Sequence, residues 1–224
     1  MDMFLDQFLN QAVLAKYTPL ILKGAGVTVI LSVLIVLAGL SLGAVLACLR
    51  AYRIRLLSFV IVIFADVLRA LPPLVLILLV FFGLPNLGIV LSSFTVLFLV
   101  LTLVLAAFAE EIVWAGITST PKGQWEAARS TGLNFTQALG YVVLPQAVRM
   151  VIPPLTNRAI AITKMTALGM VIGVPDILGQ ATTAQSFSAN ASPLTLAAFA
   201  YVVIFLPLVI ASRWLETRFA RGGH

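Results

Sequence analysis

Charged residues are scarce in this sequence of 224 residues. Only 10% are Asp, Glu, Lys or Arg, whereas 61% are hydrophobic; a soluble domain is roughly a quarter charged and half apolar. Three long stretches, residues 24–49, 70–109 and 165–175, have no charged residue at all. Because a membrane-spanning helix needs about 20 mainly apolar residues, the scarcity of charge excludes a soluble protein and predicts an all-α integral membrane protein.

Cysteine and histidine are also nearly absent. Cys48 and His224 are the single representatives of their kinds, so neither an internal disulfide nor a Cys/His metal site is expected. The phosphate-binding pattern G-x-x-x-x-G-K-[ST] does not occur in the sequence. The basic residues that give a net charge of +6 are scattered at the ends of apolar runs, which excludes a nucleic-acid partner. We therefore expect no enzyme activity, no bound cofactor and no metal in this chain.

Five apolar segments predict five transmembrane helices, at residues 20–49, 56–82, 93–118, 150–174 and 194–219. Gly, Pro and Asn predict a turn at residues 83–88, and residues 179–193 are expected to form an uncharged connection. Before the first span, Phe4, Leu5, Phe8 and Leu9 repeat at helical spacing, which predicts a short helix on the membrane surface.

Positive charges favour one orientation of these helices. Arginines and lysines gather in the first connection, in the third connection and at the C-terminus: Arg50, Arg53, Arg55, Lys122, Arg129, Arg149, Arg213, Arg218 and Arg221. The second and fourth connections carry no charge. Since basic loops stay in the cytoplasm, we expect the N-terminus outside and the C-terminus in the cytoplasm. Lys16 and Lys23 oppose this orientation, partly offset by Asp2 and Asp6.

Residues 121–145 form a polar stretch in the third connection. Pro121 and Gly123 break the preceding helix, and residues 124–130 predict a short helix. Gly132 permits a turn, and residues 133–143 predict a second short amphipathic helix that Pro145 ends before the next span. Two short helices that meet at a glycine would form a cytoplasmic docking knob for a soluble partner. The alternative is an ordinary surface loop with an interfacial helix.

The spacing of this stretch resembles the EAA loop of ABC importer permeases, "EAA…G………I.LP". The matching residues are Glu126, Ala127, Ala128, Gly132, Leu144 and Pro145, with Val142 at the usual Ile position. "AFAEEIVWAGITSTPKGQWEAA", "FADVLRALPPLVLILLVFFGLP" and "LPQAVRMVIPPLTN" are similar to segments of the polar amino acid permeases.

The resemblance implies a fold, partners and a location. It implies a type I ABC importer-like fold with five transmembrane helices, in which residues 1–224 form one permease domain and residues 121–145 form the coupling loop. The expected partners are a second permease subunit (a homologous chain or the chain itself), two ATPase subunits that bind ATP and Mg, and an extracytoplasmic solute-binding protein. The expected location is the bacterial plasma (inner) membrane, with several passes. Glu126 would pair with a basic group on the ATPase, and Gly132 would let the knob fit its cleft.

An ion-coupled secondary transporter is the main alternative. Such a protein is built from inverted repeats around a coupling-ion site, and neither is visible in the sequence.

Several charged residues lie within the predicted spans, where they are costly and often functional. Asp66 and Arg69 are placed to pair on one helix face, either as a structural ion pair or with a role in gating or solute binding. Glu110 and Glu111 are interpreted as structural or inter-subunit contacts.

The stretch "NRAIAITKMTALG" resembles the subfamily's "NEFIALLKDTSL". It keeps Asn157, Lys164 and Thr166, but has Arg158 where Glu is usual and Met165 where Asp is usual. Asn157 and Lys164 fall nearly on one helix face, as do Arg158 and Met165. The loss of two acidic positions favours an acidic or polar neutral amino acid, or a related anion, over a cationic solute.

The candidates for the solute path are Asp66, Arg69, Asn157, Arg158, Lys164, Met165 and Thr166. Two alternatives stay open. Arg158 could face lipid headgroups or the partner permease. The partner could also hold the solute, since Leu76 stands where Gln is common in the subfamily.

Overall fold

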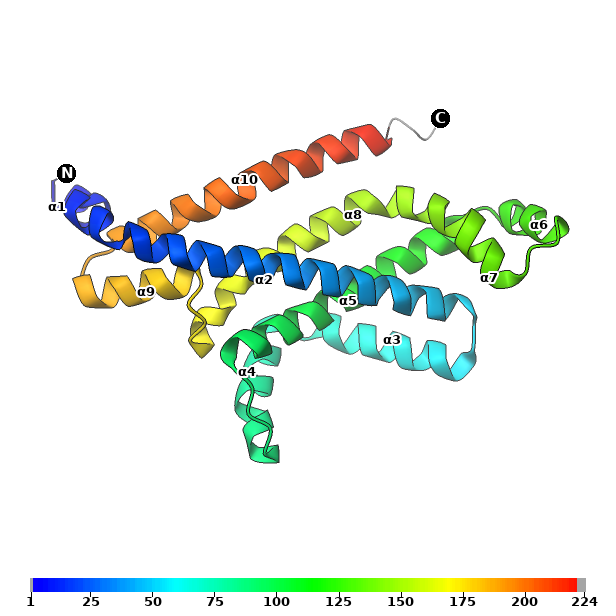
Figure 1. The fold of residues 1–224 in the computed structure, drawn as a ribbon, viewed down its shortest axis with the longest axis horizontal. Helices are drawn as coiled ribbons and strands as arrows, with labels where there is room; N and C mark the ends of the chain where they lie inside the picture. The colour runs from blue at the N-terminus through cyan, green and yellow to red at the C-terminus, as the bar shows by residue number, and fades with distance from the viewer. Residues whose placement is uncertain (1, 221–224) are drawn as a thin grey trace. The chain divides into compact units, whose positions relative to one another are not determined.

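A computed structural model describes residues 2–220, and no strand occurs within that range. The elements are α1 (Asp2–Leu9), α2 (Gln11–Ala51), α3 (Arg55–Ala70), α4 (Pro73–Gly83), the 3₁₀ helix η1 (Leu84–Leu87), α5 (Ser93–Ser119), α6 (Lys122–Ser130), α7 (Phe135–Ala138), the π-helical turn η2 (Leu139–Val143), α8 (Leu144–Lys164), the 3₁₀ helix η3 (Met165–Ile172), α9 (Ile177–Ser188) and α10 (Ser192–Ala220). Figure 1 shows the chain coloured from the N-terminus to the C-terminus, with the α-helices labelled. Arg221 and His224 of the expected cytoplasmic tail lie outside the described residues.

Four helical runs are long and apolar enough to cross a membrane, and the bent pair Arg55–Ala70 and Pro73–Leu87 makes a fifth if it counts as one span. The sequence predicted one continuous helix over residues 56–82, which is wrong. Pro72 and Pro73 lack the backbone N–H that a helix interior needs, and a proline also disfavours helical geometry in the residue before it. The chain therefore breaks between α3 and α4.

One further expectation needs correction. Pro145 does not end the second segment of the polar stretch, because helical backbone continues from α7 through η2 into α8. Pro145 closely follows the π-helical turn η2, so its missing N–H falls where the regular α-helical hydrogen bonding is already interrupted. The uncharged connection at residues 179–193 contains most of α9, a helix that the sequence analysis did not predict.

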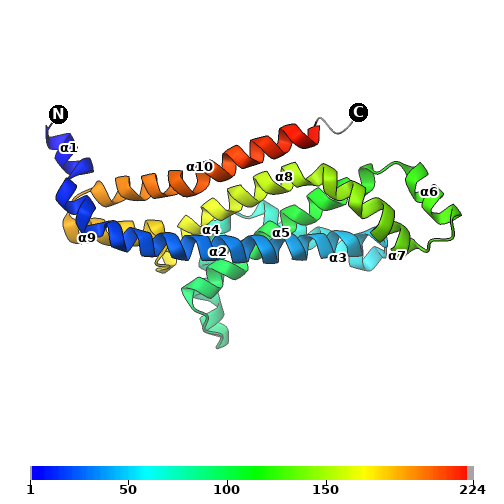
Figure 2. The same cartoon turned by 45° about the horizontal axis from the view of Figure 1, so that its top comes forward.

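The described residues divide into two compact units, with residues 2–36, 71–102 and 160–210 in the first and residues 37–70, 103–159 and 211–220 in the second. In the first unit, α9 packs beside the early part of α2 (Figures 1 and 2), around Ile21, Ile177 and Ala181. The turn between α1 and α2 is bonded to the start of α10, since Asn10 N–H donates to Ser192 Oγ over 2.9 Å. Phe4, Leu5, Phe8 and Leu9 of α1 are exposed.

Asp176 fixes the start of α9 in the first unit. Its side chain is fully buried and accepts hydrogen bonds from Gly179 N–H over 2.8 Å and from the Tyr201 hydroxyl over 3.2 Å. Burial raises the pKa of this carboxyl above its usual range, because desolvation disfavours the charged form, and the bond from Gly179 opposes that effect only in part. An aspartate N-cap of this kind is the signal that could have predicted α9.

The second unit is built on close contact between α2 and α5. A Cβ added to Gly43 would lie 2.5 Å from the Ala109 Cβ and 2.7 Å from the Ala106 carbonyl oxygen, so only glycine lets the two backbones approach this closely. In both views α3 runs alongside the end of α2 (Figures 1 and 2). The core at this end comprises Ala47, Ala51, Val113, Ile117, Leu139, Val143, Ala147 and Val151.

Candidate coupling loop and solute-path residues

The polar stretch begins with the short helix α6, as the sequence predicted, whereas its second helix is the start of the continuous helical run from α7 through η2 into α8. α6 ends at Ser130, and Gly132 follows with φ of +90°, a conformation that strains any residue with a Cβ. Asn134 then caps α7 in a reciprocal pair of bonds with Gln137, each of 2.9 Å. The glycine turn and the capping box together reverse the chain between the two helices.

Aromatic stacking and apolar packing hold this loop on its own unit. The Trp125 and Phe135 rings stack with centroids 5.2 Å apart, and Tyr52 donates to or accepts from Thr136 over 3.0 Å. Leu139 is buried in the core described above. The loop is therefore packed against the ends of α2 and α5 as one body.

The six residues of the EAA pattern divide by exposure. Glu126, Ala127, Gly132 and Pro145 are exposed, Leu144 is half-buried and Ala128 is buried. Glu126 has no ion-pair partner among residues 2–220. Ala128 and Leu144 thus pack toward the protein, and Glu126 and Ala127 remain available on the surface.

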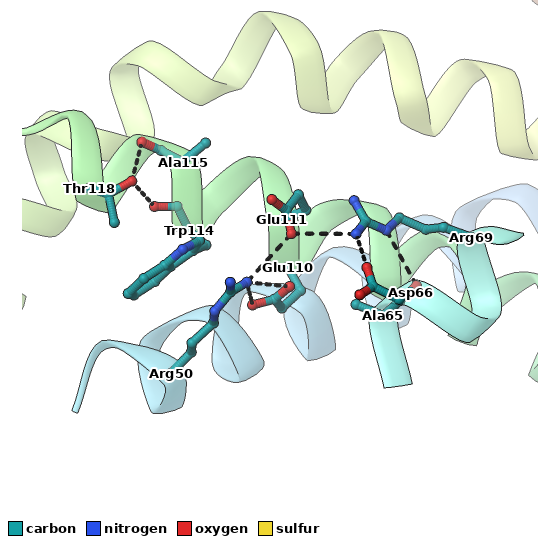
Figure 3. Close-up of polar contacts among 9 residues, drawn as sticks. All are labelled: Arg50, Ala65, Asp66, Arg69, Glu110, Glu111, Trp114, Ala115 and Thr118. Carbon is teal, nitrogen blue, oxygen red and sulfur yellow. Dashed lines mark hydrogen bonds and ion pairs between the residues drawn. The ribbon is translucent and has the colours of Figure 1, made fainter. Parts of the chain in front are cut away.

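A network of charged side chains ties α2, α3 and α5 together (Figure 3). Arg50 Nη1 lies 3.0 Å from Glu110 Oε1 and 3.4 Å from Glu111 Oε2, and its guanidinium is 4.6 Å from the centre of the Trp114 ring. Arg69 Nη2 lies 3.6 Å from Glu111 Oε2 and also pairs with Asp66. The predicted pairing of Asp66 and Arg69 is confirmed, and both glutamates make contacts within the chain.

Asn157 and Arg158 each have a partner within the second unit. Asn157 Oδ1 accepts a hydrogen bond from Ser212 Oγ over 2.6 Å, and its amide group donates to Glu216. The Arg158 guanidinium lies 3.9 Å from the centre of the Phe108 ring. Both side chains are thereby held against α10 and α5.

Lys164, Met165 and Thr166 belong to the first unit. Lys164 is exposed and lines a cavity of about 450 Å³ together with Ala167, Tyr201, Val202, Phe205, Leu206 and Val209. Met165 is half-buried, and the buried Thr166 donates to the Thr163 carbonyl over 2.9 Å. The α-helix ends at Lys164, so the α-helical spacing that put Arg158 and Met165 on one face does not extend to Met165.

Sequence reasoning missed Tyr201 and Phe205, which form the wall opposite Lys164. The Lys164 Nζ lies 5.9 Å from the centre of the Phe205 ring. Tyr201 could have indicated the cavity in the sequence, because it is a polar aromatic residue in an otherwise apolar span. In the described part of the chain no three Cys, His, Asp or Glu residues are grouped as metal ligands would be.

Comparison with known proteins identifies the family. The family model for the binding-protein-dependent transport system inner membrane component matches residues 35–221. Over 196 residues, 86% of this chain and 90% of the relative, the chain is 35% identical to the probable glutamine ABC transporter permease protein GlnP of Bacillus subtilis (strain 168). It is 32% identical over 202 residues, 89% of this chain and 92% of the relative, to the arginine transport system permease protein ArtQ of the same organism.

The fold agrees with these relatives. A crystal structure of an amino acid ABC transporter with histidines matches with a TM-score of 0.83 at 33% identity, covering 92% of this chain and 96% of that one. The expected type I permease fold and the expected role in amino acid transport are confirmed. The chain belongs to the family of binding-protein-dependent transport system inner membrane components, as a multi-pass permease of the amino acid ABC transporters.

Proposed function

We propose that this chain is the permease subunit of an ATP-driven importer of acidic or polar neutral amino acids, or of related anions. It works in the bacterial plasma membrane with its N-terminus outside. Two permease chains, homologous or identical, pair with two ATPase subunits and receive solute from an extracytoplasmic binding protein. The ATPase subunits bind ATP and Mg and perform the hydrolysis.

The cavity at Lys164 carries the proposal for the solute. Lys164 is the one charged residue among its seven lining residues, and aliphatic and aromatic side chains form the rest of the wall. A carboxylate beside a lysine ammonium in an apolar cavity gains a charge-assisted hydrogen bond, whereas a second cation would be repelled. The names of the relatives include both glutamine and arginine, so the preference rests on the residues of this chain.

Arg158 and Met165 support the same preference. Both stand where the resembling permeases have acidic residues, and Arg158 keeps a positive charge against Phe108. Neither residue provides a counter-charge for a cationic side chain. A solute with a net positive charge therefore finds no acidic partner at these two positions.

The coupling loop supports the proposed mechanism. Closure of the ATPase dimer on ATP moves the two loops, and the packing of Trp125, Phe135 and Leu139 transmits that motion to the spans. Glu126 pairs with a basic group of the ATPase. Gly132 allows the reversal of the chain that presents α6 to the cleft of the ATPase subunit.

Uptake by the complete transporter in proteoliposomes tests the solute preference. We expect glutamate or glutamine to be imported in preference to arginine, and Lys164→Gln to weaken apparent glutamate affinity by about tenfold or more. Lys23→Gln is the matched control, since Lys23 is an exposed lysine of the same unit that does not line the cavity. Efficient arginine import that Arg158→Glu leaves unchanged would contradict the preference.

A further inference from the structure

A second cavity, of about 390 Å³, lies in the second unit where α2 and α5 end and α6 begins. Its volume is within the range of small-molecule sites. The wall comprises Ala51, Arg53, Trp114, Ile117, Thr118, Thr120, Lys122, Trp125, Glu126, Arg129 and Phe135. The cavity therefore combines the ends of two spanning helices with the first helix of the coupling loop.

Positive charge dominates this wall. Arg53, Lys122 and Arg129 are exposed basic residues that line it, and Glu126 is the single carboxylate among the lining residues. None of the three basic residues forms an ion pair with another residue in the described part of the chain. Three cations that the protein does not neutralise favour an anionic ligand.

Arg53 is held in an uncommon backbone conformation. Its φ is +56°, a left-handed geometry that costs a residue with a Cβ about 1–2 kcal/mol relative to its ordinary conformation. Glycine would occupy this position between α2 and α3 with less strain. The presence of an arginine here is explained if its guanidinium is used for binding.

Two tryptophans favour a position of the cavity near the level of lipid headgroups. Trp114 and Trp125 line it, and tryptophan concentrates at the membrane–water interface. Both spans end beside the cavity, α2 at Ala51 and α5 at Ser119. Buried Ala51 and Ile117 give its wall an apolar part, which suits a ligand with a charged head and a hydrocarbon body.

We infer that this cavity binds the phosphate group of an anionic phospholipid. Basic pockets between transmembrane helices bind such headgroups on the cytoplasmic side, and arginine matches phosphate oxygens in a bidentate geometry. The lipid would touch Arg53 and Lys122 together with α6, so its binding would stiffen the coupling loop where it meets the spans. This inference concerns a lipid and does not depend on which solute the transporter carries.

Tryptophan quenching of the purified full chain tests the inference. The chain has three tryptophans, so the Trp214→Phe background leaves only Trp114 and Trp125 as reporters. In neutral detergent, brominated phosphatidylglycerol should quench them at least about fivefold more effectively than brominated phosphatidylcholine, because each basic residue contributes about a factor of five to the binding of an anionic headgroup. Equal quenching by the two brominated lipids would overturn the inference.

Variants separate this site from general attraction of anionic lipid. Arg53→Gln/Lys122→Gln should lower the preference by more than about fivefold, whereas Arg149→Gln/Arg213→Gln, which removes two exposed charges outside the cavity, should retain it. Arg53→Gly removes the guanidinium and relieves the backbone strain, so it should lower the preference about fivefold without loss of thermal stability. An equal loss in the control pair would show that the preference is not local and would overturn the assignment.

Two other ligands are distinguished in the same assay. Inorganic phosphate should not displace the brominated lipid at millimolar concentration, and displacement would assign the cavity to a free anion instead. Addition of the ATPase subunit should leave the lipid preference intact. If assembly removes it, the cavity belongs to the ATPase docking surface and the lipid assignment is wrong.

Discussion

Glu110 is a carboxylate with no exposure to solvent inside a membrane-spanning helix. Such a group is tolerated only where a fixed partner compensates for lost hydration. Arg50 supplies that partner over 3.0 Å, and Trp114 covers the guanidinium from the other side. At this position the side chain that neutralises the charge is itself held in place, so the pair acts as a rigid link between α2 and α5.

Neutralising Glu110 should therefore destabilise the protein strongly. Glu110→Gln leaves Arg50, which is only 17% exposed, without its nearest carboxylate, and breaking a buried pair in this way costs about 3 kcal/mol or more. Chemical unfolding of the purified chain in mixed micelles measures the loss. Glu111→Gln is the control, because Glu111 is 42% exposed and exposed pairs contribute up to about 1 kcal/mol. Equal losses in both variants would contradict this account of the network.

Close packing of α2 on α5 is a property of the elements rather than of one side chain. Gly43→Ala would place a methyl group against the backbone of α5, at 2.7 Å from the Ala106 carbonyl oxygen, and we expect a loss of about 1–3 kcal/mol in unfolding free energy. Gly26→Ala lies on the same helix with open space around it and should gain up to about 1 kcal/mol from better helix propensity. Unfolding of the two variants under identical conditions measures the difference. An unchanged stability in Gly43→Ala would mean that the helices can separate without cost.

The coupling loop depends on the backbone of Gly132. An added Cβ would meet no neighbour within 4 Å, yet φ is +90°, so any effect of Gly132→Ala comes from backbone strain of about 1–2 kcal/mol. We expect weaker stimulation of ATPase activity by the solute-loaded binding protein, with the permease still present in the membrane. Gly140→Ala, also in open space but with an ordinary φ, should leave that stimulation unchanged. If both variants lost the stimulation, the left-handed backbone at Gly132 would not be the cause of the loss.

Elements governed by local composition could be predicted, and elements governed by one or two special residues could not. The uniformly apolar runs predicted α5 and α10 to within a few residues, because a helix surrounded by lipid requires only an apolar sequence of sufficient length. The break at Pro72 was missed because hydropathy does not detect it. α9 was missed because its helix is polar and its stability comes from the buried N-cap Asp176 and from contact with α2.

The candidate sites differ in the same way. The candidate coupling loop could be proposed from the sequence because its six residues lie within twenty positions, so their spacing is informative by itself; its coupling role stays a prediction. The cavity at Lys164 could not be located, since Tyr201 and Phe205 come from a different helix whose apolar sequence has no distinguishing period. Single-domain organisation of residues 1–224 and the roles of the individual site residues stay predictions.

The transporter as a whole should depend on ATP and not on an ion gradient. The described part of this chain presents a packed loop at residues 121–145 with an exposed Glu126 and no metal-ligand group, and the family works with separate binding proteins. In proteoliposomes that contain the complete transporter and internal ATP, inactivating the partner ATPase should abolish solute uptake. Collapsing the proton and sodium gradients should leave it within about twofold, because no transport step of an ATP-driven importer draws on them. Uptake that survives ATPase inactivation and is lost with the gradients would place the energy source in the chain itself, and would require a coupling-ion site that the proposed mechanism does not contain.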